Sequence, residues 1–267
     1  LVECMHFNGQ EMSYIESLIL GVLQGVTEFL PISSSGHLVI VQHFLGVVNE
    51  GLFFEVILHL GTLISILIYY YQDLQKIIIN YFKGNYGAKN YVHCLIIATL
   101  PAAIIGFLFQ SVIENAFVFS LVKWMFGITG LFIGLTYFII NKTNKKMIWS
   151  IAIMIGIAQV FALLPGISRS GITISCALFM GIKHEQAAKF SFYMAIPILI
   201  GATFLQLISL ENYKVFFSMP LFVAFISSAV SGYLVINFLL NVITKGKFYL
   251  FSVYCFILSF ILFFFNL

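Results

Sequence analysis

Residues 24–37 read Gln24-Gly-Val-Thr-Glu-Phe-Leu-Pro-Ile-Ser-Ser-Ser-Gly-His37, and residues 159–171 read Gln159-Val-Phe-Ala-Leu-Leu-Pro-Gly-Ile-Ser-Arg-Ser-Gly171. Both stretches place a proline and a serine-rich turn inside an otherwise apolar chain. At a fixed offset of 135 residues, the distance from one glutamine to the other, several polar and small residues coincide. The coinciding pairs are Gln24 and Gln159, Ser33 and Ser168, Ser35 and Ser170, and Gly36 and Gly171. The two stretches therefore predict two related halves of one site.

The two stretches differ in the charged groups that they carry. Where the first has Ser34, the second has Arg169, which is the only arginine in the chain. The first stretch also supplies the carboxylate of Glu28 and the imidazole of His37. A guanidinium is always charged and matches phosphate oxygens in a bidentate fork. Together the two halves favour a phosphate ester or anhydride over a neutral ligand.

The composition indicates a membrane protein. Of the 267 residues, 61% are hydrophobic and only 9% are charged, and the mean hydropathy is +1.05. Soluble domains carry about 25% charged residues. We therefore predict an all-α polytopic membrane protein and expect no nucleic-acid partner.

Six segments are long and apolar enough to cross a bilayer as helices. They are residues 52–71, 90–110, 117–141, 187–209, 217–241 and 247–266. Residues 14–48 and 147–182 are instead pairs of short helices, each interrupted by proline and serine. A helix that starts at Tyr14 and stops near Leu30 measures about 24 Å, which is short of a hydrocarbon core of about 30 Å. Both pairs are therefore predicted to be re-entrant hairpins.

The limits of the first short helix follow from its flanking residues. Ser13 and Glu16 have the spacing of a capping box, which favours a helix start at Tyr14. Pro31 has no N–H and disfavours helix at the residue before it. The helix is therefore expected to stop near Leu30.

The lysines predict how the chain is oriented in the membrane. Ten of them fall in four connections, and the positive-inside rule places these connections in the cytoplasm. The ten are Lys76, Lys83, Lys89, Lys142, Lys145, Lys146, Lys183, Lys189, Lys245 and Lys247. Under this constraint the two hairpins enter from opposite sides, and their tips meet inside the membrane. The expected fold is an inverted-topology repeat, an architecture that builds sites at the membrane midplane.

One integral membrane domain is expected over residues 13–267, with repeat one at about 13–141 and repeat two at about 147–267. Residues 1–13 are polar and acidic and lack a basic start, so no cleavable signal peptide is expected. Residues 1–12 are treated as an N-terminal extension of uncertain origin and are assigned no function.

Glu28 lies in an apolar helix, where a carboxylate costs about 2.5–3.5 kcal/mol on insertion scales and should face a wet or paired interior. Gln24 precedes it by four residues and shares its helical face. Carboxylate and amide oxygens are hard ligands that suit Mg²⁺ or Ca²⁺. The pair is therefore predicted to bind a metal ion, and the alternative is a glutamate that pairs with another helix for structure alone.

The turn from Pro31 to His37 carries more hydroxyls than a helix start requires. Ser33 or Ser34 can cap the next helix, and the free N–H groups of its first turn make an anion site. His37 lies three residues after Ser34, so it could act as base or acid for a serine or a water. A purely structural histidine is the alternative.

Arg169 opens the second half-helix and is the strongest single candidate for holding phosphate. Its alternative role is a purely structural pairing with Glu28. Thr173 could add a hydroxyl one turn further on. Glu55 and His59 are one turn apart on a long span and could line the same cavity, with interhelical hydrogen bonding as the equal alternative.

The chain resembles the undecaprenyl-diphosphatase family, the bacitracin-resistance proteins of bacteria. Residues 24–37 and residues 164–174 (L-P-G-I-S-R-S-G-I-T-I) are similar to the two signature motifs of that family. Shorter similarities lie at residues 54–56, 100–102 and 188–192. The resemblance runs from about residue 13 to the C-terminus.

The resemblance implies removal of the terminal phosphate of undecaprenyl diphosphate, which recycles the lipid carrier of peptidoglycan synthesis. It also implies a multi-pass protein of the bacterial cell membrane, an outward-facing site, a divalent cation such as Mg²⁺ or Ca²⁺, contact with membrane lipids and often a homodimer. The predicted catalytic residues are Glu28, Ser34, His37 and Arg169. The predicted substrate-binding residues are Ser33, Ser35, Gly36, Ser168, Ser170, Gly171 and Thr173.

In the expected mechanism, Ser34 attacks the terminal phosphorus while His37 handles its proton, and water then releases phosphate. Direct attack by water, with Ser34 only binding phosphate, is the nearest rival. A secondary transporter shares the inverted repeats and broken helices, and a lipid flippase is a further alternative. A phosphatidic-acid phosphatase is a weaker option, because the later histidine and downstream aspartate of that superfamily are not found.

Overall fold

The computed structural model describes residues 6–7, 10–11, 13–45, 51–116, 118–139, 144–209 and 218–264. Almost all of these residues are helical, which confirms the predicted all-α class. A short antiparallel pair, β1 (His6–Phe7) and β2 (Gln10–Glu11), precedes the first helix. The helices are α1 (Tyr14–Phe29), α2 (Ser34–Leu45), α3 (Gly51–Tyr69), α4 (Tyr71–Phe82), α5 (Tyr86–Leu108), α6 (Gln110–Asn115), α7 (Phe119–Leu135), the 3-10 helix η1 (Thr136–Phe138), α8 (Trp149–Phe161), α9 (Arg169–Phe179), α10 (His184–Ser209), α11 (Met219–Thr244) and α12 (Leu250–Phe264).

Four described helices are long and apolar enough to cross a membrane: α5, α7 with η1, α10 and α11. α3 and α4 pass the same test together, but they meet at an angle of 73° and so count as one broken span at most. α12 has 15 described residues, or about 23 Å of helix. Four or five of the six expected spans therefore have the required length within the described part of the chain.

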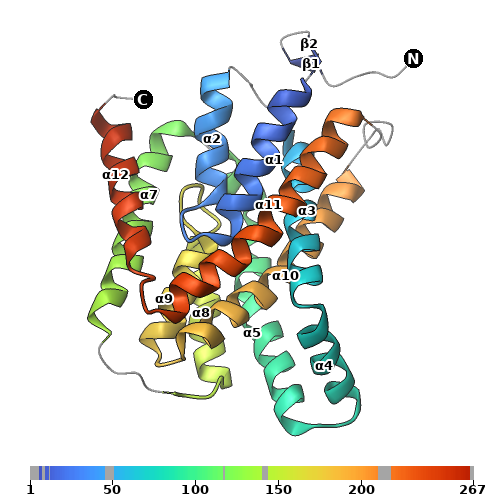
Figure 1. Ribbon diagram of the computed structural model, residues 1–267, viewed down its shortest axis with the longest axis vertical. Coiled ribbons are helices and arrows are strands. Elements are labelled where there is room, and N and C mark those ends of the chain that lie inside the picture. The colour runs from blue at the N-terminus through green and yellow to red at the C-terminus, as the bar shows by residue number, and fades with distance from the viewer. Residues whose placement is uncertain are drawn as a thin grey trace.

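The two interrupted helix pairs lie where the sequence predicts them. α1 begins with the capping box of Ser13 and Glu16 and ends at Phe29, two residues before Pro31. α8 and α9 are separated by a corresponding turn over residues 162–168. In Figure 1, α1–α2 descends from the end of the molecule where α12 finishes, and α8–α9 rises from the opposite end. The turns of the two pairs meet in the middle.

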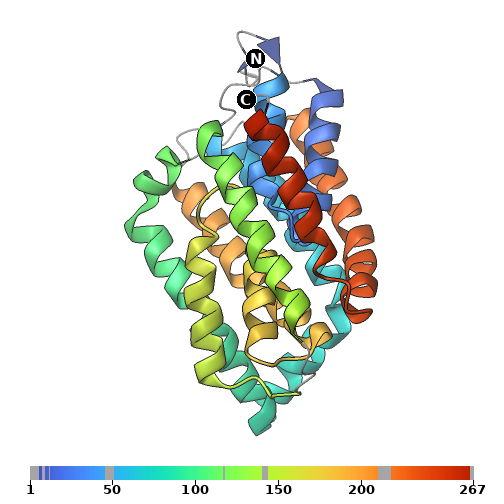
Figure 2. The same ribbon diagram turned by 90° about the vertical axis from the view of Figure 1, so that its left-hand side faces the viewer.

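Each pair packs against a helix of the other repeat. α1 lies along α11, and α8 lies along α5. At the 135-residue offset, α5 falls within the range of α11, so the two contacts correspond in the repeat. Gly25 of α1 faces Ser228 of α11, and a Cβ on Gly156 of α8 would lie only 2.7 Å from the backbone oxygen of Ala98 in α5. Small residues at these crossings let the helix backbones approach closely. α7 and α12 also lie side by side (Figure 2).

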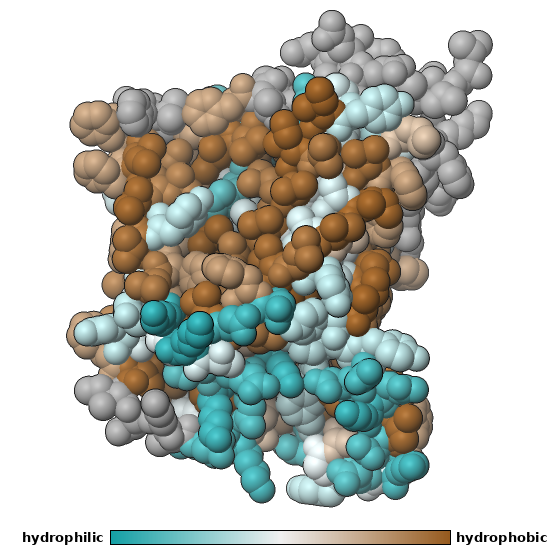
Figure 3. Space-filling view, in the orientation of Figure 1, coloured by the Kyte–Doolittle hydropathy of each residue, from teal (hydrophilic) through white to brown (hydrophobic). Residues whose placement is uncertain are grey.

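The outer surface is apolar over most of the length of the molecule. Leu234 of α11 and Phe260 of α12 are 64% and 68% exposed. Figure 3 shows hydrophobic residues over the upper part of one face and hydrophilic residues gathered at the lower end. Residues 144–148 and the α4–α5, α9–α10 and α11–α12 connections lie in this lower part (Figure 1). The lysine-rich connections therefore share one end of the molecule.

Candidate active site

The two serine-rich turns are capped in the same way. Ser33 Oγ accepts a hydrogen bond from Gly36 N at 3.3 Å, and Ser168 Oγ accepts one from Gly171 N at 3.0 Å. Such side-chain caps satisfy backbone amides that a helix start leaves unpaired. Each capping hydroxyl also lies near the hydroxyl of a second serine. Ser33 Oγ is 3.3 Å from Ser35 Oγ, and Ser168 Oγ is 3.2 Å from Ser170 Oγ. The repeat in the sequence is therefore also a repeat in hydrogen bonding.

The turns touch each other at their tips. Each contains a left-handed residue, Ser33 with φ +68° in the first and Gly166 with φ +92° in the second. A Cβ on Gly36 would lie 2.9 Å from Gly166 Cα, so this close approach requires a residue without a side chain. Thr129 of α7 donates to Gly166 O at 2.9 Å and accepts from Ser168 N at 3.1 Å. The second turn is thus held by a helix of the first repeat.

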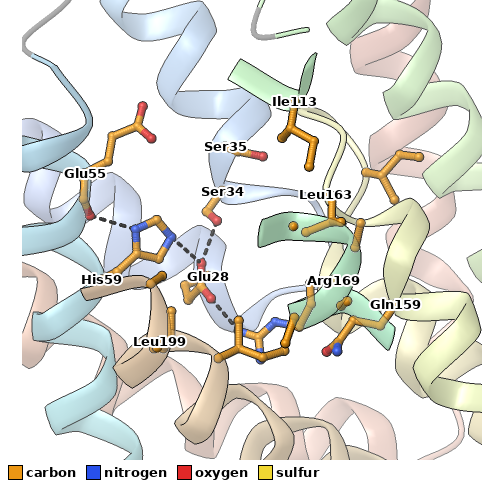
Figure 4. Close-up of a pocket in the computed structure, with 18 of the residues that line it drawn as sticks. Glu28, Ser34, Ser35, Glu55, His59, Ile113, Gln159, Leu163, Arg169 and Leu199 are labelled. Atoms are coloured by element: carbon orange, nitrogen blue, oxygen red, sulfur yellow. Dashed lines mark hydrogen bonds and ion pairs between the residues drawn. The ribbon is translucent and has the colours of Figure 1, made fainter. Parts of the chain in front are cut away.

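Glu28 is the centre of the polar contacts at the tips (Figure 4). Its Oε1 accepts from Arg169 Nη2 at 2.5 Å, and its Oε2 accepts from Ser34 Oγ at 2.6 Å and from Gln24 Nε2 at 3.2 Å. His59 Nε2 of α3 lies 3.7 Å from the same Oε2. The Glu28 and Arg169 side chains are only 6% and 17% exposed. A largely buried ion pair therefore joins the two repeats, which pairs the charges that lipid would otherwise penalise.

A cavity of about 430 Å³ opens beside this cluster. Its polar wall comes from both turns and from α3, and includes Glu28, Ser34, Ser35, Glu55, His59 and Arg169. The remaining wall is largely apolar and comes mainly from α5, α6 and α10, with side chains such as Phe107, Ile113 and Leu199. Such a cavity suits a ligand with an anionic head and an apolar chain.

The structure brings some predicted substrate-binding residues to the cavity and keeps others away. Ser33, Ser35 and Ser168 line it. Four others do not line it: Gly36, Ser170, Gly171 and Thr173. Thr173 Oγ1 donates to the backbone oxygen of Arg169 at 2.7 Å and lies 2.7 Å from Ser191 Oγ. Thr173 therefore supports the helix turn that carries the arginine and does not face the cavity.

Both ring nitrogens of His37 contact groups other than the Ser34 hydroxyl, in contrast to the expected pairing. Its Nδ1 lies 2.7 Å from the backbone oxygen of Ser33, and its Nε2 lies 2.7 Å from Tyr254 Oη of α12. The ring packs edge-on against Phe126, with centroids 5.1 Å apart, and the residue is 7% exposed. Phe126 of α7 and Tyr254 of α12 hold the ring outside the cavity. A catalytic role for His37 stays a prediction.

The predicted metal ligands Gln24 and Glu28 share a helical face as expected, but they do not form a cation site by themselves. Arg169 already balances the charge of the Glu28 carboxylate. Gln24 Oε1 is buried without a hydrogen-bond partner, so of the two residues' side-chain oxygens it is the one that could still accept a metal ion. Within the part of the chain that is described, no three His, Cys, Asp or Glu side chains gather as metal ligands. The residues therefore fit a resident divalent ion poorly.

Polar residues outside the predicted catalytic, substrate-binding and metal-binding sets also line the cavity, and for Glu55 and His59 this is one of the two alternatives that the sequence leaves open. Glu55 and His59 line it from α3, and Gln159 lines it from α8, where its Oε1 is buried without a hydrogen-bond partner. The signal for Glu55 and His59 is in the sequence, because two ionisable groups one turn apart in an apolar helix usually face a polar interior. The signal for Gln159 is its coincidence with Gln24 in the repeat.

The fold and the site define a polytopic helical membrane protein in which two broken hairpins hold a carboxylate, a hydroxyl and a guanidinium beside an apolar cavity. The chain belongs to the family described as bacitracin resistance protein BacA, which residues 17–261 match. The resemblance seen in the sequence is thereby confirmed.

Similar proteins cover almost the whole chain. The undecaprenyl-diphosphatase of Syntrophotalea carbinolica is 40% identical over 260 residues, which are 93% of this chain and 97% of the relative. That of Carboxydothermus hydrogenoformans is 41% identical over 256 residues, 93% of this chain and 95% of the relative. Undecaprenyl-diphosphatase 1 of Shouchella clausii is 36% identical over 270 residues, 96% of this chain and 97% of the relative.

Proposed function

We propose that this protein hydrolyses undecaprenyl diphosphate to undecaprenyl phosphate and phosphate, with the consumption of one water. The observation that carries the proposal is the cluster of Glu28, Ser34 and Arg169, which two hairpin turns hold at the polar wall of an apolar cavity. The name of the relatives, undecaprenyl-diphosphatase, supports the same substrate. In this role the protein recycles the lipid carrier of peptidoglycan synthesis and confers bacitracin resistance.

Arg169 and the starts of α2 and α9 bind the diphosphate. Arg169 uses Nη2 for Glu28 and Nη1 for a long contact of 3.5 Å with the backbone oxygen of Ser191. A guanidinium carries five N–H donors, so donors remain for phosphate oxygens. The positive ends of two helix dipoles add to the attraction, because both helices start at the turns.

The apolar wall of the cavity holds the first isoprene units of the substrate. α5, α6 and α10 supply this wall, and the exposed apolar side chains around it face lipid. The rest of the fifty-five-carbon chain then stays in the bilayer while the head group is cleaved. Contact with membrane lipids is therefore part of the proposal.

Ser34 attacks the terminal phosphorus, and Glu28 accepts its proton. Ser34 Oγ already donates to Glu28 Oε2 at 2.6 Å. The bond from phosphorus to the bridging oxygen breaks, undecaprenyl phosphate leaves, and water hydrolyses the phosphoserine. In the rival route water attacks the diphosphate directly, and Ser34 only binds phosphate. Rapid-quench trapping separates the routes, because phosphoserine at position 34 forms only in the first.

His37 keeps its predicted catalytic role as the competing proton acceptor. Against this role stand its contacts with Ser33 and Tyr254, which use both ring nitrogens. His37→Gln tests it: a loss of about 10²-fold or more in kcat, the range of general acid–base catalysis, supports the role. Activity within a few-fold of wild type leaves His37 as a support of the turn.

A divalent cation, Mg²⁺ or Ca²⁺, enters the proposal as a partner of the substrate. A diphosphate carries more negative charge than Arg169 can balance, and a bound divalent ion would stabilise that charge. Gln24 Oε1 and the Glu28 carboxylate are the nearest predicted ligands. Activity in EDTA, measured before and after Mg²⁺ or Ca²⁺ is restored, tests the requirement.

We further propose six membrane crossings, with α1–α2 and α8–α9 as re-entrant pairs and the lysine-rich end in the cytoplasm. The shared end of the lysine-rich connections and the opposed directions of the two pairs support this topology. The cavity then opens toward the outer side of the bacterial cell membrane. A membrane-impermeant amine reagent on intact cells should label Lys123 but spare Lys83, and labelling of Lys83 would reverse the orientation.

A homodimer is also proposed, on the family resemblance alone. Mass measurement in detergent, at several protein concentrations, tests it. A monomer at all concentrations in active protein would remove the dimer and leave the hydrolase proposal unchanged.

Phosphate release from a long-chain prenyl diphosphate by purified protein tests the function itself. Wild type should release phosphate without any ion gradient. In Arg169→Ala and in Ser34→Ala the rate of phosphate release should fall about 10²-fold or more, because each substitution removes a transition-state contact. Ser120→Ala is a matched serine control on the exposed face of α7 and should keep wild-type activity. Folded wild type without activity, in Mg²⁺ or Ca²⁺, would favour the transporter or flippase alternative.

A further inference from the structure

His59 has one ring nitrogen held by the protein and the other directed at the site (Figure 4). Nδ1 lies 2.7 Å from the backbone oxygen of Glu55, one turn earlier in α3. Nε2 lies 3.7 Å from Glu28 Oε2 and belongs to the wall of the cavity. The His59 side chain is 27% exposed, whereas the Glu28 side chain is 6% exposed. His59 is therefore open to the cavity on the side that faces Glu28.

The contact with Glu55 decides which nitrogen carries the proton. A backbone carbonyl can only accept, so Nδ1 must donate to it. In the neutral imidazole Nε2 is then an acceptor, and the facing carboxylate oxygen of Glu28 is also an acceptor. A distance of 3.7 Å is too long for a hydrogen bond. Glu28 Oε2 already accepts from Ser34 and Gln24, and the first of these bonds is lost when Ser34 is phosphorylated. A molecule that donates two hydrogens bridges Nε2 and this oxygen, and water is the reactant that does so.

His37 offers no comparable group. Its Nδ1 meets the Ser33 carbonyl and its Nε2 meets the Tyr254 hydroxyl, so both nitrogens are engaged within the protein. It also does not line the cavity. Of these two histidines, His59 is the one with a nitrogen available to a reactant in the cavity.

We propose that His59 is a further catalytic residue, which holds the water consumed in hydrolysis between its Nε2 and Glu28 Oε2. The inference rests on the proposed function and adds the position of the second reactant. Glu55 acts through His59, because its carbonyl sets the tautomer and orients the ring. α3 thereby contributes a third element to a site that the two motif turns do not complete by themselves.

The step balances in either chemical route. The water oxygen forms a bond to phosphorus, and the bond from phosphorus to the leaving oxygen breaks. That oxygen is Ser34 Oγ in the phosphoserine route and the bridging oxygen of the diphosphate in the direct route. One water hydrogen stays on the phosphate, hydrogen-bonded to His59 Nε2 during attack. The other passes to Glu28 Oε2, and then to solvent; in the phosphoserine route the proton that Glu28 took from Ser34 returns to Oγ.

The test lets methanol compete with water for the phosphoryl group. Purified protein turns over a long-chain prenyl diphosphate in methanol–water, and ³¹P NMR measures methyl phosphate and phosphate. The variants are His59→Leu, which removes the acceptor, His59→Gln, which restores an acceptor oxygen, and Arg169→Ala. His43→Leu is a matched control, because His43 is exposed at the end of α2 and outside the cavity.

We expect His59→Leu to lower kcat for phosphate release about 10²-fold with KM within about threefold, the pattern of a contact made in the transition state. The ratio of methyl phosphate to phosphate should rise about fivefold or more, because the variant no longer favours a ligand with two donor hydrogens. His59→Gln should recover about tenfold in kcat if an acceptor is what matters. The ratio is measured per turnover, so a smaller folded fraction leaves it unchanged.

An unchanged product ratio in His59→Leu, with wild type active and Arg169→Ala inactive, overturns the assignment of His59 and leaves the proposed function standing. A parallel fall of both products with a constant ratio also assigns His59 a structural role only. If the wild-type protein releases no phosphate, the proposed function is overturned as well.

Discussion

The hairpins α1–α2 and α8–α9 have the same backbone plan but carry different chemistry. In each, a serine caps the second helix and lies beside a second serine, and a left-handed residue forms the tip. At the 135-residue offset, however, Glu28 corresponds to Leu163 and Ser34 corresponds to Arg169. The first hairpin provides an anion and a hydroxyl, whereas the second provides a cation. Neither hairpin has a complete site.

This difference shows how a repeated scaffold can make an asymmetric site. The caps and the packing of α1 on α11 and α8 on α5 position both tips, and these features are shared. The few positions that face the cavity are free to differ, because their side chains do not determine the path of the backbone. Substitutions can therefore address the shared backbone features and the differing side chains one at a time.

Breaking the ion pair between the hairpins should have the largest effect. Glu28→Gln and Arg169→Ala should each lower kcat/KM about 10³-fold, and the double variant should be little worse, because the residues act as a unit. Each single variant should also lose about 3 kcal/mol or more of stability, since one charge is left buried without its partner. Steady-state kinetics and thermal unfolding in detergent measure both effects. Additive losses in the double variant would contradict a coupled pair.

Removing hydroxyls from the first turn should distinguish neighbouring serines. Ser34→Ala should lower kcat about 10²-fold or more, because Ser34 Oγ contacts Glu28 and, in the proposed mechanism, attacks the terminal phosphorus. Ser35→Ala is the matched variant, since Ser35 also lines the cavity but its hydroxyl lies near Ser33. It should lose less than about tenfold, as one neutral hydrogen bond is worth about 1 kcal/mol. Equal losses would mean that Ser34 has no special role.

Substitutions of the capping serines should show how much each turn contributes to the stability of the protein. Ser33→Ala and Ser168→Ala should each cost about 1 kcal/mol, the usual value of such a cap. Ser33→Gly should be nearly neutral or stabilising, because glycine relieves a φ of +68° and most residues pay about 1–2 kcal/mol there. Ser168, with φ −75°, gains no such relief, so Ser168→Gly should not stabilise. Unfolding temperatures of the four variants in one detergent test this contrast.

The two equivalent glutamines should show the smallest effects. Gln24→Leu removes a hydrogen bond to Glu28 and should lower kcat/KM by about tenfold or less, the value of one bond to a charged group. Gln159→Leu removes only a long contact of 3.5 Å with the Ala98 carbonyl and an unpartnered oxygen, so its stability should stay within about 1 kcal/mol of wild type. A large loss of activity in Gln159→Leu would mean that this amide contacts the substrate.

Sequence reasoning predicted the framework more fully than the contacts within it. The capping box at Ser13, the stop before Pro31 and the two broken helix pairs were all predicted from local rules, because caps and prolines act within one helical turn. The bend between α3 and α4 was not predicted. It lies at the end of the predicted span 52–71, where Gln72 and Asp73 follow directly and no proline or glycine marks the break at Tyr70.

Within the site, spacing along a helix predicted neighbours on the same helix but not partners on others. Gln24 and Glu28 are hydrogen-bonded as their spacing indicates. His37 was placed beside Ser34 by the same reasoning, yet Tyr254 of α12 holds the ring elsewhere. Thr173 likewise meets Ser191 of α10. Helical periodicity defines a face, and the neighbouring helix that meets that face depends on packing.

The amino-acid sequence alone therefore determined the membrane class, the internal repeat and the family, and it singled out Glu28 and Arg169 as site candidates, because composition, offset and isolated charges in an apolar chain are properties of the chain itself. Tertiary structure decided that Glu28, Arg169 and Ser34 meet across the repeats, that His59 faces the cavity and that His37 does not. These outcomes depend on how α3, α7 and α12 are rotated against the turns. That rotation is set by side-chain packing between distant segments, which no local pattern encodes.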